Sequence, residues 1–177
     1  AQVMAQGGPA ITTANLLADR NTRELLKHGF TAGLHFRLEL WHKGGVFDDL
    51  DDRSEWDVLV SYDPTKQVYS VVRRQNNRLL ENFGTFPSAE AAEAQIGQPF
   101  RVSLRPARPG RYYYNLIVEV RTLTENDLDA LQQWLRGTKG RSNPLSAIGR
   151  GFGKLLSRVL GGDKRHYEKQ SGEFTVT

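Results

Sequence analysis

The chain has 177 residues, no cysteine and 25% charged residues. This length is enough for one domain that buries a core without cross-links, and the lack of cysteine excludes disulfides, thiolate metal sites and thiol catalysis. Residues 141–177 carry seven Lys and Arg against three acidic residues, whereas the other 140 residues carry 17 of each sign. A body without net charge argues against a nucleic-acid partner, which binds to a basic surface.

Residues 1–9 are small, polar and glycine-rich, and they predict a flexible N-terminus. The chain begins with Ala1 rather than methionine, and we interpret this start as the result of signal-peptide removal. Residues 10–17 predict a first strand and residues 21–28 a short helix. No segment has the roughly 20 apolar residues that a membrane-spanning helix needs.

Alternation of apolar and polar residues is the main signal that follows. It predicts half-buried strands over residues 34–43, 56–62, 100–105 and 112–120. Residues 67–74 and 78–83 complete two hairpins, with turns at residues 63–66 and 76–77. In the alternating strands the apolar side chains are even-numbered, so we expect them to form one core. The set is Phe36, Leu38, Leu40, Val58, Val60, Val102, Leu104, Leu116 and Val118.

Helices are fewer and shorter than strands. Ser88 predicts the N-cap of a short helix that ends before Gly97, and Thr124 opens a helix that continues to residue 136. The predicted fold class is α+β, mainly antiparallel β: a sandwich-like sheet of five to seven strands with short helices and a C-terminal amphipathic helix. We divide the chain into the flexible residues 1–9, a β-rich domain over residues 10–136 and a basic amphipathic extension over residues 137–177.

Four apolar residues interrupt the polar side of the strands: Trp41, Leu59, Tyr113 and Ile117. Apolar side chains where polar ones are expected indicate that something covers this second face of the sheet. Trp41 and Tyr113 are the largest of them. We therefore take these two aromatic residues as candidates for contact with a partner.

The basic C-terminal segment is the other candidate for a contact. At helical spacing, seven apolar side chains of residues 144–160 fall within an arc of about 140°, and Arg150, Lys154 and Arg158 stand opposite. Three interpretations remain open: the apolar stripe docks on the second face of the chain's own sheet, it docks on a partner protein, or it lies on an anionic membrane surface. In each of them the three basic residues are free to contact a partner.

The sequence shows no catalytic or metal-binding motif. His35 and His42 are seven residues apart on one strand and so point to opposite faces. The acidic run Asp48–Asp52 lacks the ligand spacing of a calcium loop, and we interpret it as a solvated loop, with cation binding as the alternative. Residues 149–154 lack the first glycine and the hydroxyl residue of a phosphate-binding loop. We expect no enzyme activity, no metal and no cofactor.

Three stretches carry a resemblance to a known family. They are residues 33–41 (GLHFRLELW), residues 56–62 with the return strand 67–71, and residues 83–94. In this order they resemble the bacterial envelope family known only as domain of unknown function 4390, over about residues 10–136. The resemblance implies an exported β-rich protein of the periplasm or the outer face of the inner membrane, without an assigned activity or catalytic residues.

The predicted function is that of a non-catalytic exported envelope protein, which acts as a protein-binding module or as a subunit of a membrane-associated complex. A protein partner is expected, and contact with an anionic membrane is the second arrangement that we consider. Two alternatives remain: a carrier of a small apolar ligand or lipid, and a hydrolase whose site is assembled from separated residues. The large side chains on the even positions, such as Trp56 and Tyr112, argue against a spacious cavity for a ligand.

Overall fold

The computed structural model describes residues 7–76, 78–122 and 165–177, and these contain nine strands and two helices. In chain order the elements are β1 (Ala10–Ile11), α2 (Arg20–Lys27), β2 (Ala32–His42), β3 (Asp49–Asp63), β4 (Val68–Gln75), β5 (Arg78–Phe86), α3 (Ala89–Ile96), β6 (Phe100–Arg101), β7 (Gly110–Arg121), β8 (Arg165–Gln170) and β9 (Phe174–Val176). None of the helices in this part of the chain is long and apolar enough to cross a membrane.

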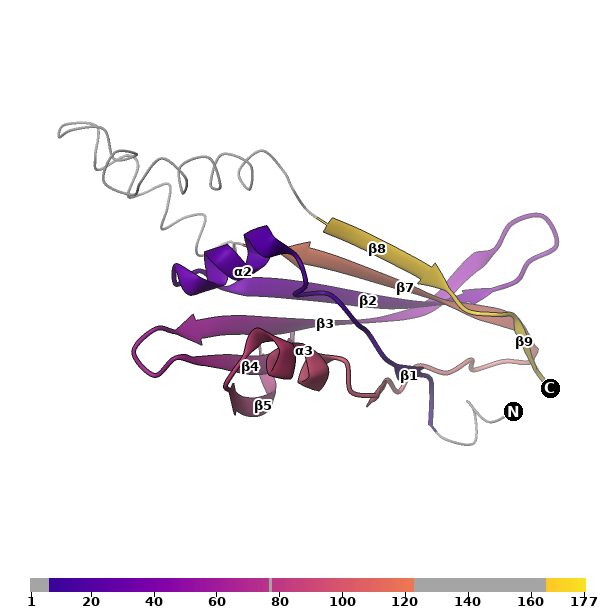
Figure 1. Ribbon diagram of the computed structural model, residues 1–177. Helices are drawn as coiled ribbons and strands as arrows, with labels where there is room; N and C mark the ends of the chain where they lie inside the picture. The colour runs from indigo at the N-terminus through magenta and orange to yellow at the C-terminus, as the bar shows by residue number, and fades with distance from the viewer. Residues whose placement is uncertain (1–6, 77, 123–164) are drawn as a thin grey trace, which may run out of the picture.

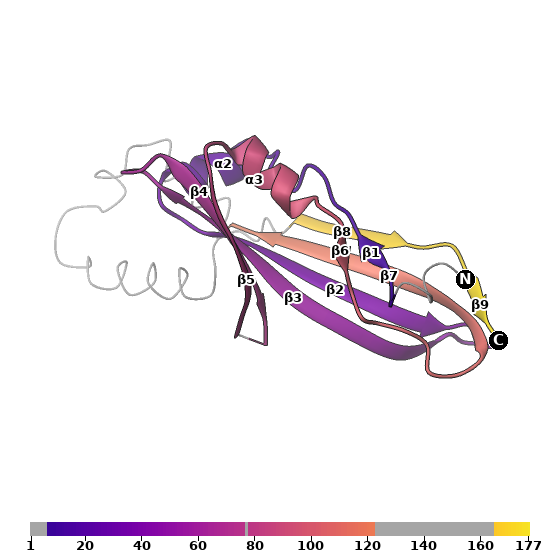
Figure 2. The ribbon, with the colours of Figure 1, turned by 90° about the horizontal axis from the view of Figure 1, so that it is seen from below.

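Seven strands form one antiparallel sheet in the order β5-β4-β3-β2-β7-β8, and β9 pairs with β7 beside β8. Strands β1 and β6 form a separate two-stranded pair. Both views of the ribbon show α2, α3 and this pair on the same side of the large sheet, which we call the inner face (Figures 1 and 2). The mainly antiparallel fold is therefore confirmed. The sandwich-like arrangement that we expected is not confirmed: in the described residues, helices and a two-stranded pair form the second layer.

The register between strands explains where the core lies. Phe36 of β2 is opposite Trp56 on one side and Val118 on the other, and directly opposed residues point to the same face of a sheet. The even-numbered side chains therefore meet on the inner face, under α2 and α3. Eight of the nine predicted core residues are buried, and the ninth, Leu116, is partly buried against them. The predicted core is confirmed.

Capping residues determine where the two helices begin and where α3 ends. The Ser88 hydroxyl accepts a hydrogen bond from the amide of Ala91, and α3 ends at Gly97, as predicted. Helix α2 begins one residue earlier than expected, because the carboxylate of Asp19 caps it by accepting from the amide of Thr22. These caps fix both helices over the inner face.

Strand β3 is longer than the sequence predicts. The acidic run that we interpreted as a loop forms its first part, with Asp49 opposite His42 and Asp52 opposite Leu40. Aspartate has a low preference for strands, so it is backbone pairing with β2 that keeps these residues extended. By contrast, the strand predicted over residues 10–17 is limited to the two residues of β1.

The end of the chain also belongs to the sheet. Strands β8 and β9, which we grouped with the C-terminal extension, both pair with β7. Strand β8 is polar and β9 has only three residues, so neither shows alternation long enough to predict a strand. The helices predicted over residues 124–136 and 145–160 lie outside the described residues, as do the domain boundary at residue 136 and the candidates Arg150, Lys154 and Arg158.

The core makes a first prediction about stability. Leu40 is fully buried, so Leu40→Ala should lower the free energy of unfolding by about 2–5 kcal/mol, as large-to-small core changes do. Leu79 is 61% exposed, and Leu79→Ala should change it by less than about 0.5 kcal/mol. Urea denaturation measures both values. Similar losses in the two variants would show that the assigned faces of the sheet are wrong.

Tyr114 makes a prediction about alkaline pH. Burial raises the pKa of its hydroxyl to about 12, and this hydroxyl donates a 2.8 Å hydrogen bond to the carbonyl oxygen of Leu104. Because the folded protein holds this proton more tightly than the unfolded chain does, stability is full below pH 10 and falls as the pH rises towards 12. The loss is on the order of 2 kcal/mol. At neutral pH, Tyr114→Phe should have a free energy of unfolding about 1 kcal/mol lower than the unchanged protein. Between pH 10 and pH 12, however, its free energy of unfolding should fall by less, because the variant has no hydroxyl at this position to titrate. Urea denaturation across this pH range tests it, and equal losses in both proteins would contradict it.

Candidate protein-contact surface

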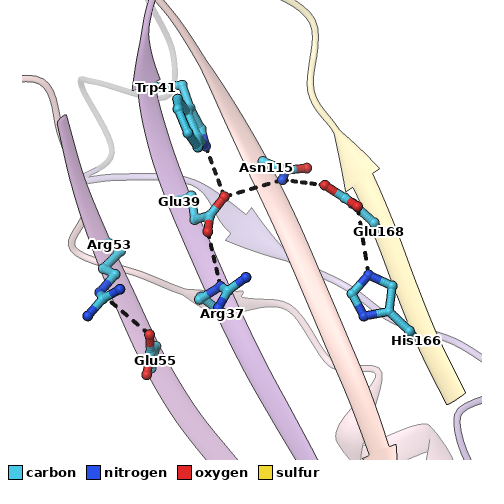
Figure 3. A network of polar contacts seen from close by, with 8 residues as sticks. All are labelled: Arg37, Glu39, Trp41, Arg53, Glu55, Asn115, His166 and Glu168. Carbon is cyan, nitrogen blue, oxygen red and sulfur yellow. Dashed lines mark hydrogen bonds and ion pairs between the residues drawn. The ribbon is translucent and has the colours of Figure 1, made fainter. Parts of the chain in front are cut away.

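The outer face of the sheet is centred on a buried carboxylate. Glu39 is only 8% exposed, although it points away from the core. It accepts hydrogen bonds from Trp41 Nε1 at 2.9 Å and from Asn115 Nδ2 at 3.3 Å, and it pairs with Arg37 at 3.0 Å (Figure 3). The two hydrogen bonds and the ion pair compensate a charge that would be costly to bury alone.

This network links three neighbouring strands, β2, β7 and β8. Asn115 also donates to Glu168 of β8 at 2.7 Å, and further ion pairs lie on either side. They are His166–Glu168, Arg53–Glu55, His35–Asp57 and Arg121–Glu119. The outer face is therefore a surface of charges that are already paired within the protein.

The apolar residues that we expected to receive a helix are spread along this charged face. Leu59 is opposite Gly33 of β2, and Tyr113 is opposite Trp41. Gly33 and Trp41 are eight residues apart on β2, which corresponds to roughly 26 Å at about 3.3 Å per residue. Ile117 lies between them, opposite Arg37. These apolar residues are thus spread along a charged face, and the helix predicted to dock there lies outside the described residues, so the docking stays a prediction.

The predicted contact residues Trp41 and Tyr113 do come together. Their rings are stacked with centroids 6.4 Å apart and planes within 5° of each other. Both are half-buried, and both use their polar groups internally: Trp41 donates to Glu39, and the Tyr113 hydroxyl donates to Asp48 at 3.1 Å. The pair therefore supports the loop that joins β2 to β3, residues 43–48.

Polar contacts close this loop at its base. Lys43 Nζ lies 3.4 Å from Asp48 and 3.4 Å from Glu173, which precedes β9. A side chain at Gly44 would overlap the carbonyl oxygen of Phe47, so only glycine fits this tight closure. The loop is therefore held from three directions: by β2, by β7 and by the C-terminal segment.

The pKa values at the base reflect these contacts. Burial raises the pKa of Asp48, but hydrogen bonds from Tyr113 and Lys43 outweigh it and hold this pKa below its ordinary value. The hydrogen bond to Asp48 raises the pKa of Lys43, and burial together with Asp48 raises that of Tyr113. Asp48 and Lys43 are therefore charged, and Tyr113 neutral, throughout the physiological range.

The loop presents apolar side chains to solvent above this fixed base. Val46 is 86% exposed, Phe47 82% and Leu50, at the start of β3, 44%. We call these three residues the contact tip. Asp49 and Asp52 are exposed next to it and form no ion pair with any described residue, whereas Asp51 pairs with Arg108 at 3.5 Å. The contact tip is thus an apolar projection with an acidic flank.

Val46 and Phe47 were not among the contact residues predicted from the sequence. The available signal was local: two consecutive apolar residues in a loop of glycine and aspartate have no alternating partner and no core to enter. Trp41 and Tyr113 were found by their position, but they lie beneath the contact tip. The acidic run that we weighed as a cation site is instead engaged by Lys43 and Arg108.

Other features of the described chain do not converge on a reaction. His35 binds Asp57 on the outer face and His42 packs against Tyr112 on the inner face, which confirms their opposite orientation. No group of three or more His, Asp or Glu side chains in this part of the chain is arranged to hold a metal ion. A pocket of about 450 Å³ lies between α2, the β3–β4 turn and α3, but charged residues such as Arg23 and Glu90 line it. It does not suit an apolar ligand.

Comparisons of the chain with protein-family models, with curated proteins and with solved structures found no match. Over residues 7–76, 78–122 and 165–177, the fold and the candidate site define an antiparallel β-sheet protein with two short helices on one face and an apolar contact tip at one end. The resemblance to the envelope family stays a prediction.

The base of the loop can be tested directly. Asp48→Ala removes the acceptor that Lys43 and Tyr113 share, so the loop should open more often. Chymotrypsin should then cleave after Phe47 several-fold faster, while the melting temperature changes little because the ion pair lies at the surface. Asp49→Ala is the matched control, since Asp49 contacts neither residue of the base. Equal cleavage rates in the two variants would contradict the proposed anchoring.

Proposed function

We propose that the protein is a non-catalytic binding module, and that it contacts a protein partner through the contact tip Val46, Phe47 and Leu50. The partner is a protein of the bacterial envelope or a subunit of a membrane-associated complex there. The envelope location is supported by the sequence resemblance alone. The choice of the contact surface is supported by the structure of the β2–β3 loop.

One observation carries the proposal: two large apolar side chains are more than four-fifths exposed on a loop whose base is fixed. Single exposed apolar residues are common on protein surfaces. Here, however, three occur together, and the stacked pair Trp41–Tyr113 and the Lys43–Asp48 contact hold the loop that presents them. A preorganised aromatic side chain loses little conformational freedom on binding, and such residues dominate the energy of protein interfaces.

The charges around the contact tip favour a protein over a membrane. Asp49 and Asp52 flank it without a cationic partner in the described residues, and anionic lipid headgroups would repel them. A protein surface with an apolar pocket for Phe47 and a rim of Lys or Arg is complementary in both shape and charge. Burial of Phe47 in such a pocket removes its ring from water and adds favourable free energy.

A photo-crosslinking phenylalanine analogue in place of Phe47 tests this proposal in cells that make the protein. We expect one adduct of discrete mass with a protein, and Val46→Ser in the same chain should reduce its yield at least fivefold. The same analogue in place of Thr65, an exposed residue of the β3–β4 turn, is the control and should give no such adduct. Mass spectrometry of the adduct identifies the partner.

Three results would overturn the proposal. The first is the absence of a protein adduct at Phe47. The second is an adduct with lipid only, which would assign the contact tip to a membrane surface. The third is an equal adduct at Thr65 or one that Val46→Ser does not reduce, since this would reflect non-specific contact.

A further inference from the structure

A groove crosses the inner face where the covering layer leaves the sheet open. It runs between the N-terminal segment of residues 9–14 and β8, and it consists of two adjoining hollows of about 280 and 260 Å³. Both hollows share Thr12, Leu116 and Lys169 in their lining, so they form one continuous groove. In Figure 2 this N-terminal segment, with β1, lies over the sheet near β7 and β8.

The floor of the groove is apolar. It is formed by inner-face side chains of β2 and β7: Leu38, Tyr114, Leu116 and Val118. Leu116 is the one predicted core residue that the inner layer does not bury fully, and Tyr167 of β8 stands beside it 43% exposed. Apolar surface that remains in contact with water at this position gains free energy when an apolar ligand covers it.

The cationic side chain of Lys169 borders both hollows of the groove. Lys169 is opposite Leu116 in the β7–β8 register, so both side chains point to the inner face. The adjacent acid, Glu168, also borders one of the hollows, but its carboxylate contacts Asn115 and His166 of the other face. Lys169 forms no ion pair with any described residue, so its ammonium group is available to a ligand anion.

The geometry points to a binding site for a single-chain anionic amphiphile, such as a long-chain carboxylate. Its carboxylate pairs with Lys169, and its hydrocarbon chain lies along Leu116 and Val118 under the N-terminal segment. The two hollows together reach the range of roughly 300–1,000 Å³ that is usual for small-molecule sites. The site is separate from the contact tip, so it stands or falls independently of the proposed protein partner.

Isothermal titration calorimetry of the full chain with dodecanoate, below its micelle concentration, tests the inference. Dodecanol and dodecyltrimethylammonium serve as neutral and cationic probes of the same chain length. We expect dodecanoate to bind at least tenfold more tightly than either. Affinity should rise about threefold for each added methylene in a series of shorter carboxylates until the groove is filled.

Variants distinguish binding in the groove from non-specific binding of the amphiphile to the protein surface. Lys169→Gln should lower the affinity for dodecanoate about tenfold and leave that for dodecanol unchanged. Lys66→Gln, at the exposed β3–β4 turn, is the matched control and should change neither. Thr12→Trp fills the groove from an exposed position without altering the core, and it should abolish binding of both probes while the melting temperature stays the same.

The inference is overturned if dodecanoate does not bind, if dodecyltrimethylammonium binds equally well, or if Lys169→Gln and Lys66→Gln behave alike. It is also overturned if sedimentation shows a dimer that Thr12→Trp dissociates, because a second copy of the chain would then occupy the groove. None of these results bears on the crosslink at Phe47, so the failure of one proposal leaves the other standing.

Discussion

The structure depends on the backbone register that pairs β2 with β3 on one side and with β7 on the other. From the bulge at Asp51 onward, this register places the even-numbered side chains of the three strands on the inner face, from Leu34 to Leu40 on β2, and the odd-numbered ones outside. A shift of one residue would move the apolar set into water and Arg37 and Glu39 into the core. The sheet therefore tolerates one arrangement only, and the two faces have different chemistry as a direct result.

In the described residues the covering layer lies on the inner face, and the outer face carries polar side chains that contact one another. Glu39 is at the centre of these contacts: Arg37 and Trp41 of its own strand and Asn115 of the neighbouring strand β7 surround its carboxylate. The same pairing removes this face from consideration as a binding surface, since a partner would have to compete with contacts already made. Trp41 belongs to this network through its indole N–H, and this bond is what orients its ring against Tyr113. The fixed base of the β2–β3 loop is thus an extension of the outer-face network.

Hydrophobic periodicity predicted the strands whose own alternating side chains determine which face is buried. It did not predict segments that are extended only because a neighbouring strand pairs with their backbone. Phe36 and Val118 could be assigned to the core from parity alone, and Ser88 to a helix cap from its side-chain chemistry. The first part of β3 could not be predicted, because Asp49–Asp52 are extended only through pairing with β2. The contact tip was missed for a related reason: the exposure of Phe47 follows from how Gly44 and Asp48 close the loop, and no periodic pattern encodes such a closure.

The edges of the sheet explain why contacts through side chains are favoured over strand addition. Strand β5 carries two bulges, at Leu80 and Phe83, which interrupt its ladder with β4. The part of β3 that extends beyond β4 has a bulge at Asp51, and the Asp52 carboxylate accepts from the amide of Arg53, which removes one donor from that edge. Strand β8 is short and carries charges of both signs. Bulges, charges and short length all oppose the pairing of a foreign strand. The edges of the sheet are thus protected, and the polar side chains of the outer face contact one another. Apolar surface in the described chain stays accessible where a loop projects from an end of the sheet or where the inner layer leaves a gap. The contact tip and the groove beside Lys169 are two such places.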